Sequence, residues 1–187
     1  LYALEMGPTD AIVRALRKIG DPAVAPDVVP LSLSTDPKLR TEAVLTIGRL
    51  RHRASLPELT RLFTREAALD KRKADTTFRA ALLEAIALIA DPQSKELFTR
   101  YRQHEDAALR LQSNAGLARL ADPALTTGIS SDRLAEKDPQ VQTAQAFALY
   151  RMGRKEYLEE VVKGLGSRRT NTRAREYLLE LKQGEVA

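Results

Sequence analysis

The sequence contains no cysteine and no tryptophan, and only two of its 187 residues are histidine. Without cysteine the chain forms neither disulfides nor thiolate metal sites, and thiol usage leaves the compartment open between cytoplasm and periplasm. Aromatic residues make up 5% of the chain, too few to interleave with basic residues as a base-stacking surface requires. No run approaches the roughly 18 apolar residues of a membrane span, so we expect none.

Motifs of catalysis are also missing. The nearest approach to a nucleophile elbow, Gly164-Leu165-Gly166-Ser167, follows a predicted helix instead of a strand, and we interpret it as a helix end followed by an N-cap. A metal site would have to use His52 or His104 with carboxylates, whereas structural zinc or catalytic iron takes three or four convergent ligands. We therefore expect two loop histidines, no cofactor and no enzyme.

The overall composition is that of a folded chain, with 43% hydrophobic and 29% charged residues. The 30 basic residues exceed the 25 acidic ones and give a net charge of +5. This excess favours a partner with an acidic surface without singling out nucleic acid.

A short phrase recurs along the chain, an apolar residue and a small residue followed by Asp-Pro. The copies are Ile19-Gly20-Asp21-Pro22, Ile89-Ala90-Asp91-Pro92 and Leu120-Ala121-Asp122-Pro123. With degenerate copies included, the closing apolar residues are Ile19, Leu50, Ile89, Leu120, Met152 and Leu181, spaced by 31, 39, 31, 32 and 29 positions. The longest spacing holds eight extra residues, which we place in a loop in the charged stretch around Glu66 to Ala74.

Each copy predicts one helix that ends at the closing residue. The positions three and seven before that residue are mostly apolar or small, so all three positions form one buried helical stripe. Fourteen positions before it stand residues that we predict to be N-caps: Asp36, Asp75, Asp106, Asp138 and Ser167. A second, shorter amphipathic segment precedes each of these helices, at 24–33, 56–63, 94–102, 125–134 and 155–165.

Two helices per repeat and no period-two pattern predict an all-α fold in a single domain, 1–187. The repeats are 1–20, 21–51, 52–90, 91–121, 122–153 and 154–187. A helical hairpin of this size cannot bury both of its faces alone, so the hairpins must stack on one another.

The phrase Asp-x-x-apolar-Arg at 36–40, 75–79 and 106–110, followed by an apolar helix, resembles the bacterial HEAT-like repeats, the short class also called phycobilisome-lyase-type. The fifth copy, 138–142, lacks the Arg, and the sixth keeps only the hydrophobic pattern and the Ser cap. The resemblance implies a right-handed α-solenoid of about five to six hairpins. It also implies that Arg40, Arg79 and Arg110 are structural and bond to the Asp-bearing turn of an adjacent repeat, while a ligand-binding ladder is the alternative.

A second column of residues, one position before the closing residues, is mainly basic and is predicted to face solvent. This basic column comprises Lys18, Arg49, Arg119 and Arg151, with Leu88 and Glu180 in the other copies. If these helices line the inner wall, as the resemblance implies, the column lies on a concave binding surface; a solvated face is the alternative. The loop Lys71-Arg72-Lys73 adds to this basic surface.

The leading hypothesis is thus a non-catalytic protein-binding or scaffold module. An electrostatic nucleic-acid binder, using the basic column and Lys71-Arg72-Lys73, is the alternative from another class. The resemblance alone adds a tetrapyrrole lyase or chaperone-like subunit.

The two ends of the chain are predicted to have uncovered apolar faces. Ile12, Val13, Leu16 and Ile19 form a face whose preceding partner helix is reduced to Leu1–Met6, and the apolar residues between Tyr177 and Leu181 occupy more than one helical stripe. We expect a fragment of a longer protein that continues upstream, docks on a partner at this end, or self-associates.

Overall fold

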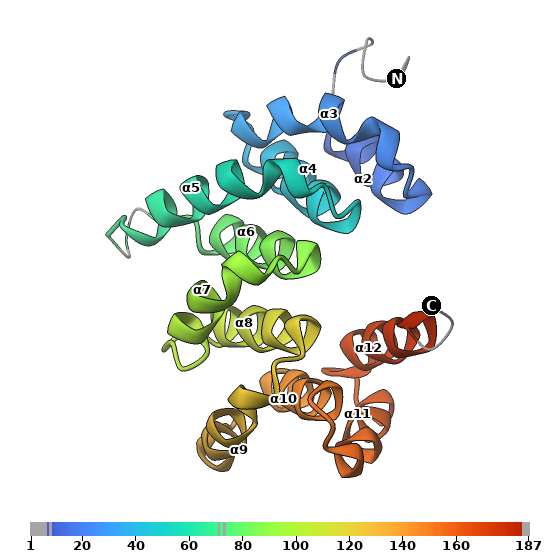
Figure 1. The fold of residues 1–187 in the computed structure, drawn as a ribbon. Coiled ribbons are helices and arrows are strands. Elements are labelled where there is room, and N and C mark those ends of the chain that lie inside the picture. The colour runs from blue at the N-terminus through green and yellow to red at the C-terminus, as the bar shows by residue number, and fades with distance from the viewer. Residues whose placement is uncertain (1–6, 8, 71, 73, 185–187) are drawn as a thin grey trace. The chain divides into compact units, whose positions relative to one another are not determined.

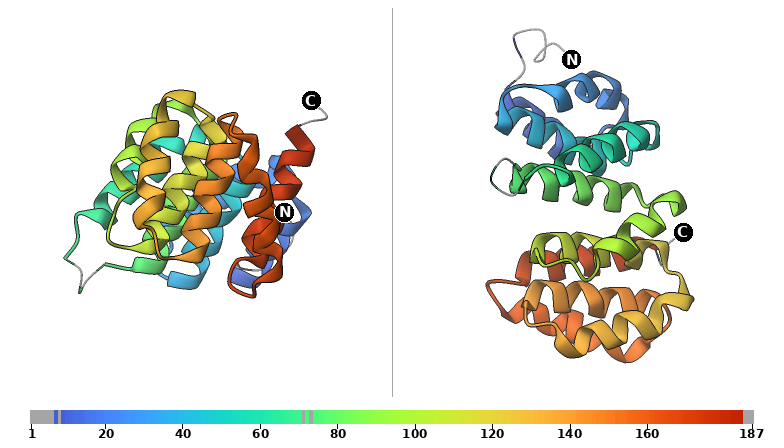
Figure 2. Two further views of the ribbon diagram at one scale, coloured as in Figure 1. Left: turned by 90° about the horizontal axis from the view of Figure 1, so that it is seen from below. Right: turned by 90° about the vertical axis from the view of Figure 1, so that its left-hand side faces the viewer.

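The computed structural model describes residues 7, 9–70, 72 and 74–184, and its elements are helical throughout (Figures 1 and 2). No β-strand occurs in this part of the chain, which confirms the all-α prediction. The predicted segment Leu1–Met6 lies outside the described residues. The chain divides into two compact units, residues 1–94 and 95–187, called here the N-terminal and C-terminal units and considered separately.

Helical hairpins make up both units. The N-terminal unit contains α2 (Asp10–Ile19), η1 (Pro22–Val24), α3 (Ala25–Val28), η2 (Val29–Leu33), α4 (Pro37–Arg49), η3 (Arg53–Ser55), α5 (Leu56–Ala67), α6 (Thr76–Ile89) and η4 (Pro92–Ser94), where η denotes a 3₁₀ turn. The C-terminal unit contains α7 (Lys95–Tyr101), α8 (Ala107–Leu120), η5 (Pro123–Leu125), α9 (Thr126–Ala135), α10 (Pro139–Arg151), η6 (Lys155–Tyr157), α11 (Leu158–Lys163), η7 (Gly164–Gly166) and α12 (Asn171–Gly184). No helix among the described residues combines the length and the apolar character needed to cross a membrane.

Aspartate side chains begin four of the long helices, which confirms the predicted N-caps. Their carboxylates accept backbone N–H groups in the first turns of α4, α6, α8 and α10, from the caps Asp36, Asp75, Asp106 and Asp138. The Ser167 prediction was wrong by one turn. Its Oγ accepts the Arg169 N–H at 3.3 Å, so it caps the turn that leads into α12 and not the helix itself.

The recurring phrase is a helix stop joined to a new start. Ala90 and Ala121 take the left-handed conformation at φ 56° and 52°, and their N–H groups close α6 and α8. Gly20 does the same for α2 at φ 75°. The following Asp then caps a 3₁₀ turn that opens with Pro, as Asp122 does by accepting the Ala124 N–H at 2.9 Å.

The predicted stripe is buried in the central repeats. Ile47, Ile86, Leu117 and Leu149, all three positions before a closing residue, are at most 1% exposed. They lie where α4 packs along α6 and where α8 packs along α10. Ile19 is a correction, because it is 73% exposed at the end of α2. The helices that cover both sides of the stripe in the central repeats have no equivalent around Ile19 among the described residues.

Two predicted segment boundaries also change. The segment 24–33 is not one helix but η1, α3 and η2, because Pro26 and Pro30 lack the N–H that a continuous helix needs. In the stretch 66–74, Glu66 and Ala67 extend α5, and the connection to α6 begins only at Ala68. The inserted residues therefore lengthen a helix as well as a loop.

Candidate binding surface

The predicted structural arginines lie in contacts between helices. Arg40 on α4 donates from Nη2 to the Asp75 carboxylate of α6 at 2.8 Å, and its guanidinium lies 4.8 Å from the Phe78 ring centroid. Burial would raise the pKa of Asp75, but the Phe78 N–H and Arg40 outweigh it and the pKa is lowered. One aspartate therefore both caps α6 and binds it to α4.

Arg110 on α8 makes a denser set of contacts with the turn before α10. Its Nε and Nη2 donate to both carboxylate oxygens of Glu136 at 2.7 and 2.9 Å, and Nη1 donates to the carbonyl oxygens of His104 and Glu105. The hydrogen bond from Arg110 lowers the pKa of Glu136 and raises that of Arg110. The acceptor in the adjacent turn is thus Glu136 and not the N-cap Asp138. Arg79 lies half-buried on α6.

Sequence reasoning missed a further set of ion pairs between the shorter helices of the C-terminal unit. Arg102, directly after α7, pairs with Asp132 on α9, and Arg133 on α9 pairs with Glu160 on α11. The signal was present in the sequence, because Arg102 and Arg133 are 31 positions apart, one repeat spacing. A large part of the basic charge is therefore used inside the fold.

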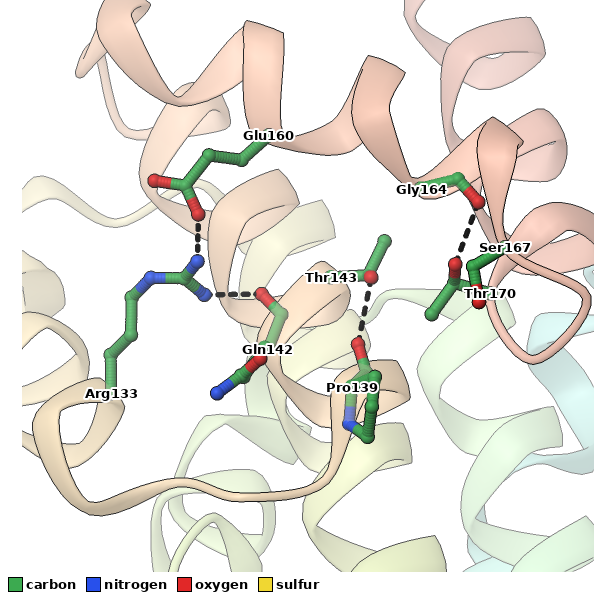
Figure 3. A pocket seen from close by; sticks show the side chains of 8 residues that line it. All are labelled: Arg133, Pro139, Gln142, Thr143, Glu160, Gly164, Ser167 and Thr170. Atoms are coloured by element: carbon green, nitrogen blue, oxygen red, sulfur yellow. Dashed lines mark hydrogen bonds and ion pairs between the residues drawn. The ribbon is translucent and has the colours of Figure 1, made fainter.

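Arg133 also lines a pocket of about 170 Å³ between α9, the start of α10 and the turn after α11 (Figure 3). Its guanidinium donates to the Gln142 carbonyl and to Glu160, and burial lowers its pKa. Thr143 and Thr170 donate to backbone carbonyls at 2.8 and 2.6 Å. Since these polar groups already bind one another, we assign no ligand to the pocket.

The basic column divides into exposed and covered members. In the N-terminal unit Lys18, near the end of α2, and Arg49, at the end of α4, are both exposed. Neither has an ion-pair partner among the described residues. For these two residues the structure agrees with the expected solvent-facing position.

Arg119 is the correction in this column. Its Nε and Nη2 donate to the two carboxylate oxygens of Glu180 on α12 at 2.9 and 3.0 Å, and the two side chains are 9% and 18% exposed. The helical wheel placed Arg119 in solvent because it describes one helix alone. Here α12 covers that side of α8, and the column residue of the last repeat neutralises a column residue of an earlier one.

Arg151 differs from both groups. It is the last residue of α10, it is half-buried, and its Nε is buried without a hydrogen-bond partner among the described residues. Arg119 and Arg151 are separated by one repeat, 32 positions, and stand on the packed pair α8 and α10. Their Cα positions therefore differ by about one interhelical distance, on the order of 8–10 Å.

The remaining candidates contribute less. Of the basic loop, Lys71 and Lys73 lie outside the described residues, and Arg72 is exposed in the connection from α5 to α6. His52 contacts the Ser55 hydroxyl at 2.8 Å, and His104 accepts the Asp106 N–H at 3.0 Å, so both histidines bond within their own turns. The described residues contain no group of three or more potential metal ligands of the His, Cys, Asp or Glu type.

Comparison with known proteins gave no relative. No profile of a known protein family matches the sequence. No curated protein matches it either.

Proposed function

We propose that the chain is a non-catalytic interaction module, an α-solenoid of HEAT-like hairpins that binds an acidic segment of a partner protein along the basic column. The repeat spacing, the capped helices and the close packing of α4 on α6 and of α8 on α10 support the solenoid.

The observation that carries the proposal is the guanidinium of Arg151. A half-buried charge without a partner is destabilising, whereas a carboxylate placed against it makes a strong, charge-assisted hydrogen bond. Arg119, at the equivalent position one repeat earlier, already binds a carboxylate with two hydrogen bonds. The column therefore has the chemistry to hold Asp or Glu side chains of a partner.

The test is retention of a protein from the source cells on the immobilised chain, compared between variants. We expect a specific retained protein whose binding weakens at least tenfold with Arg151→Gln and with Arg49→Gln. Arg100→Gln, an exposed arginine of α7 outside the column, is the matched control and keeps wild-type binding. Retention that is equal in all four proteins contradicts the proposal.

Titration with duplex DNA separates the nucleic-acid alternative. A dissociation constant tighter than about 10⁻⁴ M at low salt that weakens steeply with added salt would favour that alternative. Weaker binding leaves the protein-binding proposal in place.

A further inference from the structure

Helix α12 does not continue the packing seen between α8 and α10. In Figures 1 and 2 it lies on the side of α10 opposite α9. In a regular stack Glu180 would stand one helix beyond Arg151 and two beyond Arg119, roughly 16–20 Å from the latter. It instead accepts hydrogen bonds from Arg119 at 2.9 and 3.0 Å. The last helix has thus folded back across α10.

Two side chains hold the second half of α12 in this place. The Tyr177 ring stacks on Phe147 of α10 with centroids 4.3 Å apart and planes 6° apart, and both residues are at most 1% exposed. Glu180, three positions later, binds Arg119. Phe147 precedes Arg151 by four positions, so it belongs to the same face of α10 as the column. α12 therefore contacts that face with an aromatic ring and a carboxylate.

The first half of α12 is held separately. Asn171 Nδ2 donates to the Leu165 carbonyl and Thr170 Oγ1 to the Gly164 carbonyl, both at 2.6 Å, so the turn 167–170 is tied to η7. This turn is a fixed point about which the second half of α12 can leave α10 without loss of the first. Leu179, on the outer side of α12, is 50% exposed.

We propose that α12 is an internal occupant of the partner-binding face, and that the partner displaces it with a helix carrying an aromatic residue and, three positions later, Asp or Glu. This inference rests on the proposed function and names its ligand. The exchange replaces one ring on Phe147 and one carboxylate on Arg119 by equivalent groups, so the displaced contacts are remade. It also opens the neighbouring Arg151 to a second acidic side chain of the partner.

The probe is a fluorescently labelled peptide of residues 171–184, titrated by anisotropy against the full chain. We expect the Glu180→Gln chain to bind the peptide about tenfold or more tightly than wild type does, because a weakened internal competitor leaves the face open for a larger fraction of the time. Glu176→Gln, at an exposed carboxylate on the same helix, is the matched control and binds as wild type. Arg119→Gln combined with Glu180→Gln, or a peptide with Glu180→Lys, should lose the gain.

Amide hydrogen exchange of the Glu180→Gln chain tests the same idea without a peptide. Faster exchange confined to α12, with α8 and α10 still protected, is expected for a displaceable helix. Faster exchange of α8, α10 and α12 together would show an integral helix and overturn the inference, as would equal peptide affinity for wild type and Glu180→Gln. If the peptide results fail while retention of a cellular protein still depends on Arg49 and Arg151, only the internal-occupant inference falls. If retention is insensitive to both arginines, the proposed function itself falls.

Discussion

At the scale of single residues, the main use of charge in this chain is to join one helical hairpin to the next. Arg40 reaches the N-cap of α6, and Arg110 reaches the turn before α10. Both pairs are partly buried and hydrogen-bonded, a setting in which removing one partner costs more than it does at the surface.

The Arg110–Glu136 pair makes stability depend on pH. The pKa of Glu136 is lowered, chiefly by the hydrogen bond from Arg110, so the folded chain holds fewer protons than the unfolded chain between the two pKa values. The stabilisation is complete above the unfolded value of about 4.3 and is lost as the pH falls through the folded value. We expect urea unfolding between pH 6 and pH 3, taken as about the accessible range, to show a smaller loss of stability in Glu136→Gln than in wild type.

Glu159→Gln, at an exposed carboxylate of α11, is the control and should keep the wild-type pH dependence. An unchanged dependence in Glu136→Gln would mean that the pair does not contribute in solution.

At the scale of elements, a single glycine sets how closely α4 approaches α6. A Cβ built on Gly48 would lie 2.5 Å from the Cα of Ala85, which is backbone and cannot move aside alone. Alanine favours a helix by about 1 kcal/mol over glycine, but forcing packed helices apart costs about 1–3 kcal/mol. We expect Gly48→Ala to lower the free energy of unfolding measured in urea.

The control for this glycine is Gly166→Ala, since a Cβ there meets nothing within 4 Å. It should leave stability unchanged or slightly higher. Stabilisation by Gly48→Ala would show that α4 and α6 are not so close in solution.

The helix stops at Ala90 and Ala121 give a prediction of the opposite sign. Both alanines are left-handed, at φ 56° and 52°, a conformation that costs an L-residue about 1–2 kcal/mol and glycine almost nothing. Because glycine also gains entropy in the unfolded chain, we expect Ala90→Gly and Ala121→Gly each to raise the free energy of unfolding by about 0.5–1 kcal/mol. Ala68→Gly, at the right-handed C-cap of α5 with φ −82°, should lower it.

Periodicity and capping chemistry predicted the long helices well, because both signals are local. Asp36 to Asp138 cap as expected, and the stripe from Ile47 to Leu149 is buried. The same local reasoning failed for 24–33, where the prolines outweigh the amphipathic pattern. It could not find the Arg119–Glu180 pair, because the path of α12 depends on tertiary contacts such as Tyr177 on Phe147. The candidate site was thus predicted by position but not by occupancy.

At the scale of the whole molecule, the solenoid proposal makes a claim about shape that scattering in solution can check. A compact domain of 187 residues has a radius of gyration of about 16 Å. A stack of hairpins that contact only their neighbours is longer, so we expect a value clearly above this in small-angle X-ray scattering. Sedimentation on the same samples would establish that the particle measured is a monomer. A monomer at about 16 Å would contradict the solenoid.

The path of α12 also has a consequence for synthesis on the ribosome. Its Glu180 meets an arginine 61 positions earlier in the chain, so α8 and α10 leave the exit tunnel well before the helix that covers them. Translation adds about 5–20 residues per second, and earlier segments fold first. We therefore expect a nascent chain that has Phe147 and Arg119 uncovered for several seconds, an interval in which a partner already present in the cell can bind before α12 does.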